Sequence, residues 1–156
     1  MTLSIGDHAP DFILPTDNEN MSVTLSKLRG KKVVLYFYPK DNTPGCTKES
    51  CDFRDHYPNF KKHDVEVFGI SRDSAKSHGK FREKYSLPFP LLVDANGDVC
   101  QAYGVIDKKS MFGNTFLGIT RSTFLIDENG IIRAIWRKVK VTDHVEQVLN
   151  ELSNYA

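Results

Sequence analysis

The chain has 156 residues, of which 40% are hydrophobic and 26% charged. This composition is typical of a compact globular protein and argues against disorder, so we expect one domain over residues 1–156. The 21 basic and 20 acidic residues leave a formal net charge of +1, which provides no strong field for nucleic acid or an anionic membrane. The sequence also lacks the pattern of a membrane helix or a signal peptide, so we expect a cytoplasmic protein.

The first strong pattern is the β-branched and aromatic run over residues 33–38. Such a run predicts a strand that is buried on both faces. A helix is expected to begin near Pro44 and to carry an apolar face through Phe60. Pro58 should kink or split this helix, because proline lacks the backbone N–H that the preceding turn needs.

Shorter elements continue the alternation of strand and helix. We expect a strand over residues 65–70, a helix that starts at Asp73 or Ser74 and reaches Tyr85, a strand over 91–93 and a short helix over 99–103. The chain then ends in a predicted β-hairpin and a helix. The hairpin strands are residues 122–127 and 131–138, and Asp143 with Glu146 predicts the start of the helix.

This order of elements predicts the fold class. Sequential strand–helix–strand units produce a mixed sheet with helices on both faces, and the final hairpin adds antiparallel strands. We therefore expect an α/β protein with a thioredoxin-like fold, a mixed sheet flanked by helices, and an N-terminal strand extension within residues 3–28.

The chemistry of the chain centres on Cys46. Three cysteines are too few for a secreted disulfide scaffold, and Pro44 and Gly45 place Cys46 in the first turn of a helix, where unpaired N–H groups favour a thiolate. An ordinary cysteine is only about 3% ionised at pH 7, so ionisation alone gains at most about thirtyfold. Fast chemistry therefore also needs donors that bind the transition state, such as the hydroxyl of Thr43. The alternative is that Cys46 is an unreactive buried thiol.

Several segments carry a family resemblance. Pro39, Thr43 and Cys46 fit the PxxxTxxC active-site motif of peroxiredoxins, and residues 37–54 resemble the peroxiredoxin Q subfamily, also called bacterioferritin comigratory protein. Residues 6–12 and 120–127 are similar to the same subfamily. The resemblance therefore covers nearly the whole chain.

The resemblance implies a thiol peroxidase and a role for each matching residue. Cys46 would attack the peroxide, Thr43 would bind it, and Arg121 would stabilise the thiolate and the transition state. Pro39 would shield the pocket, and Glu49 would position Arg121. From the residues alone, Glu49 is equally well explained as a solvated carboxylate at a helix start, and Arg121 as an ordinary charge at a strand end.

Cys51 would be the resolving cysteine, which condenses with the Cys46 sulfenic acid to form an intramolecular disulfide. Helix geometry tests this role, because Cα atoms five residues apart in a regular helix are about 9 Å apart and their side chains diverge by about 140°. A disulfide needs less than about 7 Å. We therefore predict that residues 44–52 unwind on oxidation.

Other residues give weaker signals. Cys100 has no activating neighbours and is expected to be an inert packed thiol; it is the second choice for the resolving cysteine. Residues 110–118 resemble the loop that lines the peroxide pocket in this family, although a loop packed on the core explains them equally well. The five histidines and the CxxxxC spacing match no metal-site pattern, and no phosphate-binding glycine loop is present, so no metal or other cofactor is expected.

Two other functions remain open at this point. The Cys46–Cys51 pair could switch a protein-binding surface in a redox sensor, or serve a disulfide reductase, although that chemistry usually uses CxxC. For the peroxidase we expect hydrogen peroxide and organic hydroperoxides as substrates, thioredoxin or a glutaredoxin-like protein as the reductant, and a monomer.

Overall fold

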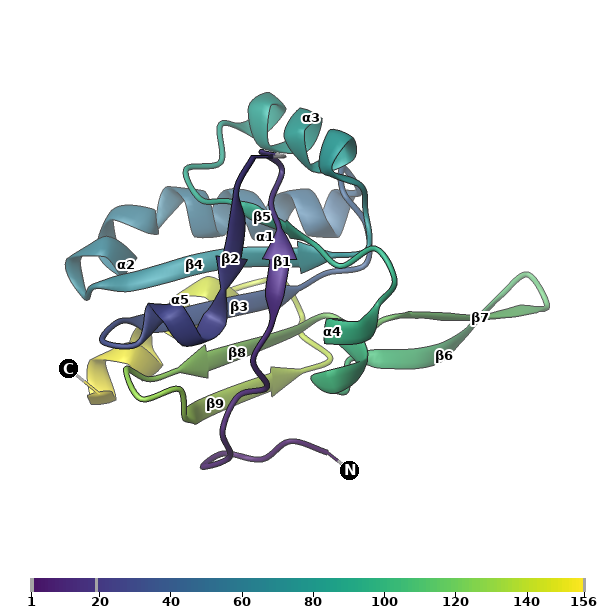
Figure 1. The fold of residues 1–156 in the computed structure, drawn as a ribbon. Helices are drawn as coiled ribbons and strands as arrows, with labels where there is room; N and C mark the ends of the chain where they lie inside the picture. The colour runs from purple at the N-terminus through teal and green to yellow at the C-terminus, as the bar shows by residue number, and fades with distance from the viewer. Residues whose placement is uncertain (1, 19, 156) are drawn as a thin grey trace.

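The structure is a computed structural model that describes residues 2–18 and 20–155. Its centre is a five-stranded mixed sheet with the strand order β5-β4-β3-β8-β9, in which β3, β4 and β5 are parallel and β8 is antiparallel to both β3 and β9 (Figure 1). The sheet strands are β3 (Lys32–Phe37), β4 (Val65–Ser71), β5 (Leu91–Val93), β8 (Ser122–Ile126) and β9 (Ile132–Arg137).

Strand β3 divides the interior into two apolar cores. Val33, Leu35 and Phe37 belong to one core, and the alternate residues Val34 and Tyr36 belong to the other, as expected for a strand whose side chains point to opposite faces in turn. The second core is covered by α1 (Pro44–Asp55), α2 (Tyr57–Lys62), α3 (Ala75–Tyr85) and α5 (His144–Leu152). The first is covered by the hairpin β1 (Ile13–Pro15) and β2 (Ser22–Thr24), by the 3-10 helix η1 (Leu25–Leu28) and by α4 (Asp98–Ala102). The 3-10 turn η2 (Ser153–Tyr155) follows α5.

Most of the predicted elements are confirmed. Residues 33–37 of β3 are all buried, and the expected hairpin near the C-terminus is β8–β9. The predicted helix after Pro44 is split into α1 and α2, with Pro58 in the first turn of the second helix, where its missing N–H costs nothing. Ser74 is the N-cap of α3, and its side chain accepts a hydrogen bond from the Ser77 amide.

Two expectations are wrong. Residues 110–118 do not form a loop; most of them belong to the antiparallel hairpin of β6 (Ile106–Met111) and β7 (Asn114–Ile119), which projects from the body of the protein (Figure 1). Asp143 is the N-cap residue of α5, but its side chain makes no capping hydrogen bond. Its φ of 62° is left-handed, whereas a capping side chain needs an extended backbone to reach the first turn.

No helix in residues 2–18 and 20–155 is long and apolar enough to cross a membrane.

Candidate active site

The sheet places Cys46 at the carboxyl end of its central strand. After β3, the loop of residues 38–42 leads to Thr43, the N-cap of α1, whose extended backbone lets Pro44 begin the helix. The carbonyl of Thr43 accepts the amide of Thr47 and closes the first helical turn. Cys46 lies in this turn and is 1% exposed. Its position has no acidic neighbour in the first turn, so the positive end of the helix favours negative charge on the sulfur.

Arg121, the residue before β8, supplies a cation to this thiol. Its Nη2 donates a hydrogen bond to Cys46 Sγ at 3.3 Å, and its Nη1 donates to Glu49 Oε1 at 2.7 Å. The guanidinium therefore bridges a sulfur and a carboxylate from two successive turns of α1. Burial lowers the pKa of Arg121, but the Glu49 carboxylate and the Cys46 sulfur outweigh burial and raise it. Arg121 is thus a permanent positive charge beside the thiol.

Glu49 holds this guanidinium in place, but burial destabilises the ionised form of Glu49. Its side chain is fully buried, and Oε2 has no hydrogen-bond partner among the described residues. Burial raises the pKa of Glu49 to about 7, although the charge and hydrogen bond of Arg121 lower it in part. A proton on Oε2 would therefore remove the buried charge and leave the Arg121 bond at Oε1 intact.

Glu49 and the buried His144 should give opposite pH dependences of stability. Burial first, and then the charge of Arg121, lowers the pKa of His144 to about 4, so its contribution is complete above about pH 6.5 and is lost as the pH falls through 4. The contribution of Glu49 is complete below its ordinary pKa of 4.5 and is lost as the pH rises through about 7. Each contribution amounts to about 3 kcal/mol.

Urea unfolding between pH 4 and pH 7.5 checks this prediction. On lowering the pH, the stability difference between the parent protein and His144→Gln should shrink, whereas the difference between the parent protein and Glu49→Gln should grow. General acid effects act on all three proteins and cancel in these differences. Two differences that do not change with pH would contradict the assignment.

Gly45 lies against the guanidinium of Arg121. A Cβ at this position would approach Arg121 Nη2 to 3.1 Å, so Gly45→Ala should push Arg121 away from Cys46 and weaken the bond to the sulfur. We expect alkylation of Cys46 by iodoacetamide near pH 6 to slow about fivefold, the equivalent of about 1 kcal/mol of hydrogen bonding. The free energy of unfolding should not fall, because alanine favours helix.

A second helical glycine provides the matched control for this variant. A Cβ on Gly79 of α3 would meet nothing closer than the Asp17 carbonyl at 4.0 Å. Gly79→Ala should therefore leave the alkylation rate unchanged. Equal rates for the parent protein and Gly45→Ala would show that Arg121 does not act on the sulfur.

The other residues of the motif, Thr43 and Pro39, have different surroundings. Thr43 is half-buried, and its hydroxyl donates to the Lys40 carbonyl at 2.9 Å rather than toward the sulfur. The oxygen lone pairs of Thr43 remain available to accept a hydrogen bond. Pro39 is exposed and borders a cavity of about 560 Å³ that Met111, Phe116 and Leu117 of the projecting hairpin also line.

All three cysteines are free thiols. Cys51 lies on the same helix as Cys46 and is half-buried, and burial raises its pKa. Cys100 is completely buried in the other core, away from α1. Burial, together with the neighbouring Asp94, raises the pKa of Cys100, which agrees with the expectation of an inert thiol.

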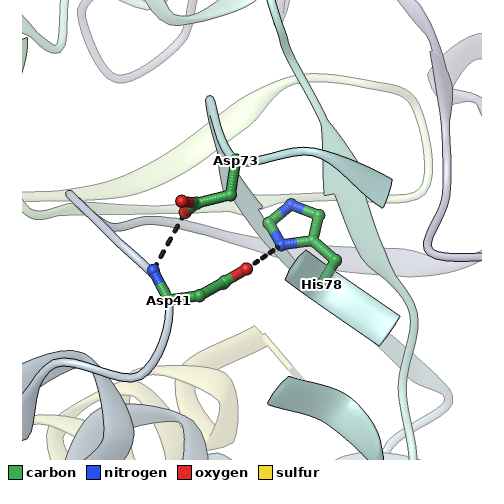
Figure 2. Close-up of side chains that lie close together, drawn as sticks. All are labelled: Asp41, Asp73 and His78. Carbon is green, nitrogen blue, oxygen red and sulfur yellow. Dashed lines mark hydrogen bonds and ion pairs between the residues drawn. The ribbon is translucent and has the colours of Figure 1, made fainter. Parts of the chain in front are cut away.

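One further cluster, which includes Asp41 of the loop between β3 and α1, was not predicted from the sequence. Asp41, Asp73 and His78 bring their polar atoms to within 4.8 Å of one another (Figure 2). His78 showed only a partial signal, namely its position three residues before the buried Phe81 on α3. No pattern in the sequence indicates that it meets Asp41, which is 37 residues away.

Comparisons with known proteins agree with this geometry. The profile of the AhpC/TSA family matches residues 5–135. Peroxiredoxin Bcp of Bacillus subtilis is 51% identical over 154 residues, which cover 99% of this chain and 98% of the relative. Peroxiredoxin Bcp of Escherichia coli K12 is 43% identical over 154 residues, with the same coverage of both chains.

Solved structures show the same fold. The crystal structure of a cysteine-to-serine mutant of Xylella fastidiosa PrxQ superposes with a TM-score of 0.93 at 40% identity and covers 99% of this chain and 98% of its own. The Xanthomonas campestris bacterioferritin comigratory protein, described with alkyl peroxide reduction activity, gives a TM-score of 0.88 at 42% identity and covers 92% of this chain and 91% of its own. The fold is therefore the predicted thioredoxin-like α/β fold. The chain belongs to the AhpC/TSA family of peroxiredoxins, in its Bcp/peroxiredoxin Q subfamily, and is a thiol peroxidase.

Proposed function

We propose that this peroxidase reduces hydrogen peroxide and organic hydroperoxides through Cys46. The observation that carries the proposal is the 3.3 Å hydrogen bond from Arg121 Nη2 to Cys46 Sγ in the first turn of α1. The same cation that holds the thiolate can stabilise the negative charge that moves onto the peroxide oxygens as the sulfur attacks. Glu49 keeps the guanidinium in place for both states.

The oxidative step is a two-electron transfer from sulfur to oxygen. The Cys46 thiolate attacks the distal oxygen of ROOH, so that an S–O bond forms while the O–O bond breaks. The leaving RO⁻ takes up a proton to become ROH, and Cys46 becomes a sulfenic acid. We assign Thr43 to binding the peroxide, since its oxygen can accept the O–H hydrogen of ROOH, and Pro39 to shielding the pocket.

The cavity beside Pro39 supports organic hydroperoxides as substrates. Its volume is about 560 Å³, and Met111, Phe116, Leu117 and Ile119 contribute apolar side chains to it. An alkyl group attached to the peroxide would find apolar contacts there. The alkyl peroxide reduction activity of the Xanthomonas campestris relative agrees with this substrate class.

Cys51 is the proposed resolving residue. Its thiol attacks the sulfenic sulfur of Cys46, a Cys46–Cys51 disulfide forms, and water leaves. A dithiol protein, thioredoxin or a glutaredoxin-like protein, then donates two electrons by thiol–disulfide exchange and restores both thiols. Because resolution within one chain needs no second subunit, we propose a monomer in which residues 1–156 act as one domain. We also propose a cytoplasmic location, where such reductants keep thiols reduced.

A coupled assay tests this function. The protein should oxidise reduced thioredoxin in a peroxide-dependent way over many turnovers. Cys46→Ser should abolish turnover, Cys51→Ser should permit only the first oxidation of Cys46, and Cys100→Ser, the matched control, should retain full activity. A single stoichiometric oxidation of the unaltered protein, without turnover, would instead indicate a redox sensor.

A further inference from the structure

A buried hydrogen-bond network connects the loop before α1 to helix α3 (Figure 2). Asp41 Oδ1 accepts a hydrogen bond from the Tyr38 hydroxyl at 2.5 Å, and Oδ2 accepts one from Ser77 Oγ at 2.8 Å. The same Oδ2 lies 2.7 Å from Nδ1 of His78. The side chains of His78 and Asp41 are 0% and 3% exposed. The network is therefore shielded from solvent, where each of its bonds is difficult to replace.

The geometry requires a proton between Asp41 and His78. The other ring nitrogen of His78, Nε2, lies 2.8 Å from the Leu92 carbonyl, which can only accept, so Nε2 carries a hydrogen. Nδ1 and Oδ2 would both be acceptors if neither were protonated, and two acceptors do not approach to 2.7 Å. One proton is therefore shared by the pair. Each polar side-chain atom of the pair thus has a hydrogen-bond partner, and none is left directed at a cation.

Asp41 lies in a loop that hydrogen bonds attach to α3 and to the residue before its N-cap. The next residue, Asn42, has a left-handed φ of 60°, a conformation that asparagine adopts more readily than other non-glycine residues. The Asp41 amide donates to Asp73 Oδ2 at 2.9 Å, and Asn42 Oδ1 accepts from the Tyr85 hydroxyl at 3.3 Å. Thr43 follows directly, so the peroxide-binding hydroxyl depends on this attachment to α3.

We propose that His78 is a positioning residue of the peroxidase site, which acts through its shared proton with Asp41 to fix the loop that presents Thr43 to Cys46. This inference rests on the proposed function. Arg121 approaches the sulfur from the residue before β8, and its hydrogen bonds go to Cys46 and Glu49 of α1 rather than to this loop. Loss of the His78–Asp41 bond should therefore lower the rate of the reaction with peroxide more than it lowers the rate of Cys46 alkylation.

Two amide substitutions separate the positioning bond from simple structural support. In His78→Asn, the side-chain amide lies near the place of Nδ1 and can still donate to Asp41. In His78→Gln, the amide lies near the place of Nε2, so it can donate to the Leu92 carbonyl but leaves Asp41 without its partner. Each variant loses one of the two bonds of a fully buried ring, so similar losses of stability are expected.

Stopped-flow oxidation of the reduced variants by hydrogen peroxide provides the test. We expect the second-order rate constant to fall at least about tenfold in His78→Gln and to stay within about threefold of the parent value in His78→Asn, the difference that one buried hydrogen bond to a charged group makes. The rate of Cys46 alkylation by iodoacetamide should be unchanged in both, since Arg121 is in place.

Equal peroxide rates in the two variants would overturn the positioning role, as would a parallel fall of the alkylation and peroxide rates in His78→Gln. His144→Gln, a change at another buried histidine, whose Nε2 is bonded to Thr123 of β8, should leave both rates unchanged. The two proposals fail in different ways. If the parent protein itself does not react with peroxide, then the proposed function is wrong, whereas a fast parent protein with equal variants contradicts only the role of His78.

Discussion

Arg121→Met should lower the second-order rate constant of Cys46 with hydrogen peroxide by about 10²- to 10³-fold, the loss typical of a removed oxyanion donor. Arg121 lies within hydrogen-bond reach of the sulfur, and methionine fills much of the same volume without charge or donors. Arg121→Lys should recover only part of the rate, because one ammonium group cannot bridge the sulfur and Glu49 as the planar guanidinium does. Stopped-flow kinetics of the reduced protein measure both variants.

The buried Glu49 does not confound this result. Its pKa is already raised to about 7 by burial, so Glu49 should take up a proton when Arg121 is lost and the fold should survive. The double variant Arg121→Met/Glu49→Gln removes the titrating carboxyl and should be as slow as Arg121→Met alone. Arg133→Met on β9 is the control, because it removes a comparable positive charge and an ion pair with Asp127. Its rate constant should stay within about twofold of the parent value, as expected for a surface change. A fast, folded Arg121→Met protein would show that Arg121 has no part in the chemistry.

Formation of the Cys46–Cys51 disulfide should unwind the first half of α1. Both cysteines lie within the helix Pro44–Asp55, where their Cα atoms are about 9 Å apart and cannot be bridged. Opening must break the Glu49–Arg121 ion pair and the 2.9 Å bond between Tyr36 and Ser50. We expect amide exchange over residues 45–52 to accelerate by at least about a hundredfold in the oxidised protein, the loss of more than about 2.7 kcal/mol of local protection.

The structure also predicts where the unwinding stops. Phe53 is completely buried and stacks on Tyr36 with ring centroids 4.6 Å apart, and it also contacts Phe60 of α2. Amides beyond Phe53 should therefore keep their protection. Exchange measured by mass spectrometry in the reduced and oxidised protein checks this boundary, with peroxide-treated Cys51→Ser as the control that cannot form the disulfide. Unchanged protection of residues 45–52 in a protein whose Cys46–Cys51 disulfide is verified would contradict the prediction.

Local patterns were sufficient to predict most of the fold. The run over residues 33–38 identified the central strand because both of its faces are buried. Pro58 identified the break between α1 and α2 because proline lacks a backbone N–H in any surroundings. The position of Cys46 in a first helical turn likewise followed from Pro44 and Gly45. Each of these signals comes from residues close together in the chain.

The hairpin β6–β7 could not be predicted in this way. Its strands project from the body and have few buried side chains, so they show no alternation of apolar and polar residues. The turn consists of Phe112 and Gly113, both with positive φ, whereas asparagine or aspartate is the usual first residue of such a turn. Phe112 is 96% exposed, which is the opposite of what its apolar character suggests.

The contacts of the site are between residues far apart in the chain. Glu49 and Arg121 are separated by 72 residues, and Asp41 and His78 by 37. The first pair was anticipated only through the family resemblance, and the second was missed. Such pairs depend on how β8 and α3 pack around the end of β3, which hydrophobic periodicity alone does not determine.

Peptide mapping after addition of one equivalent of hydrogen peroxide to the reduced, folded protein at neutral pH tests the reactivity of Cys46 most directly. The peptide that contains Cys46 should be recovered linked to Cys51 and lighter by two hydrogen atoms. In Cys51→Ser, a sulfenic-acid trap such as dimedone should label Cys46 and leave Cys100 untouched. Recovery of Cys46 as an unmodified thiol, while the peroxide remains unconsumed, would contradict the account.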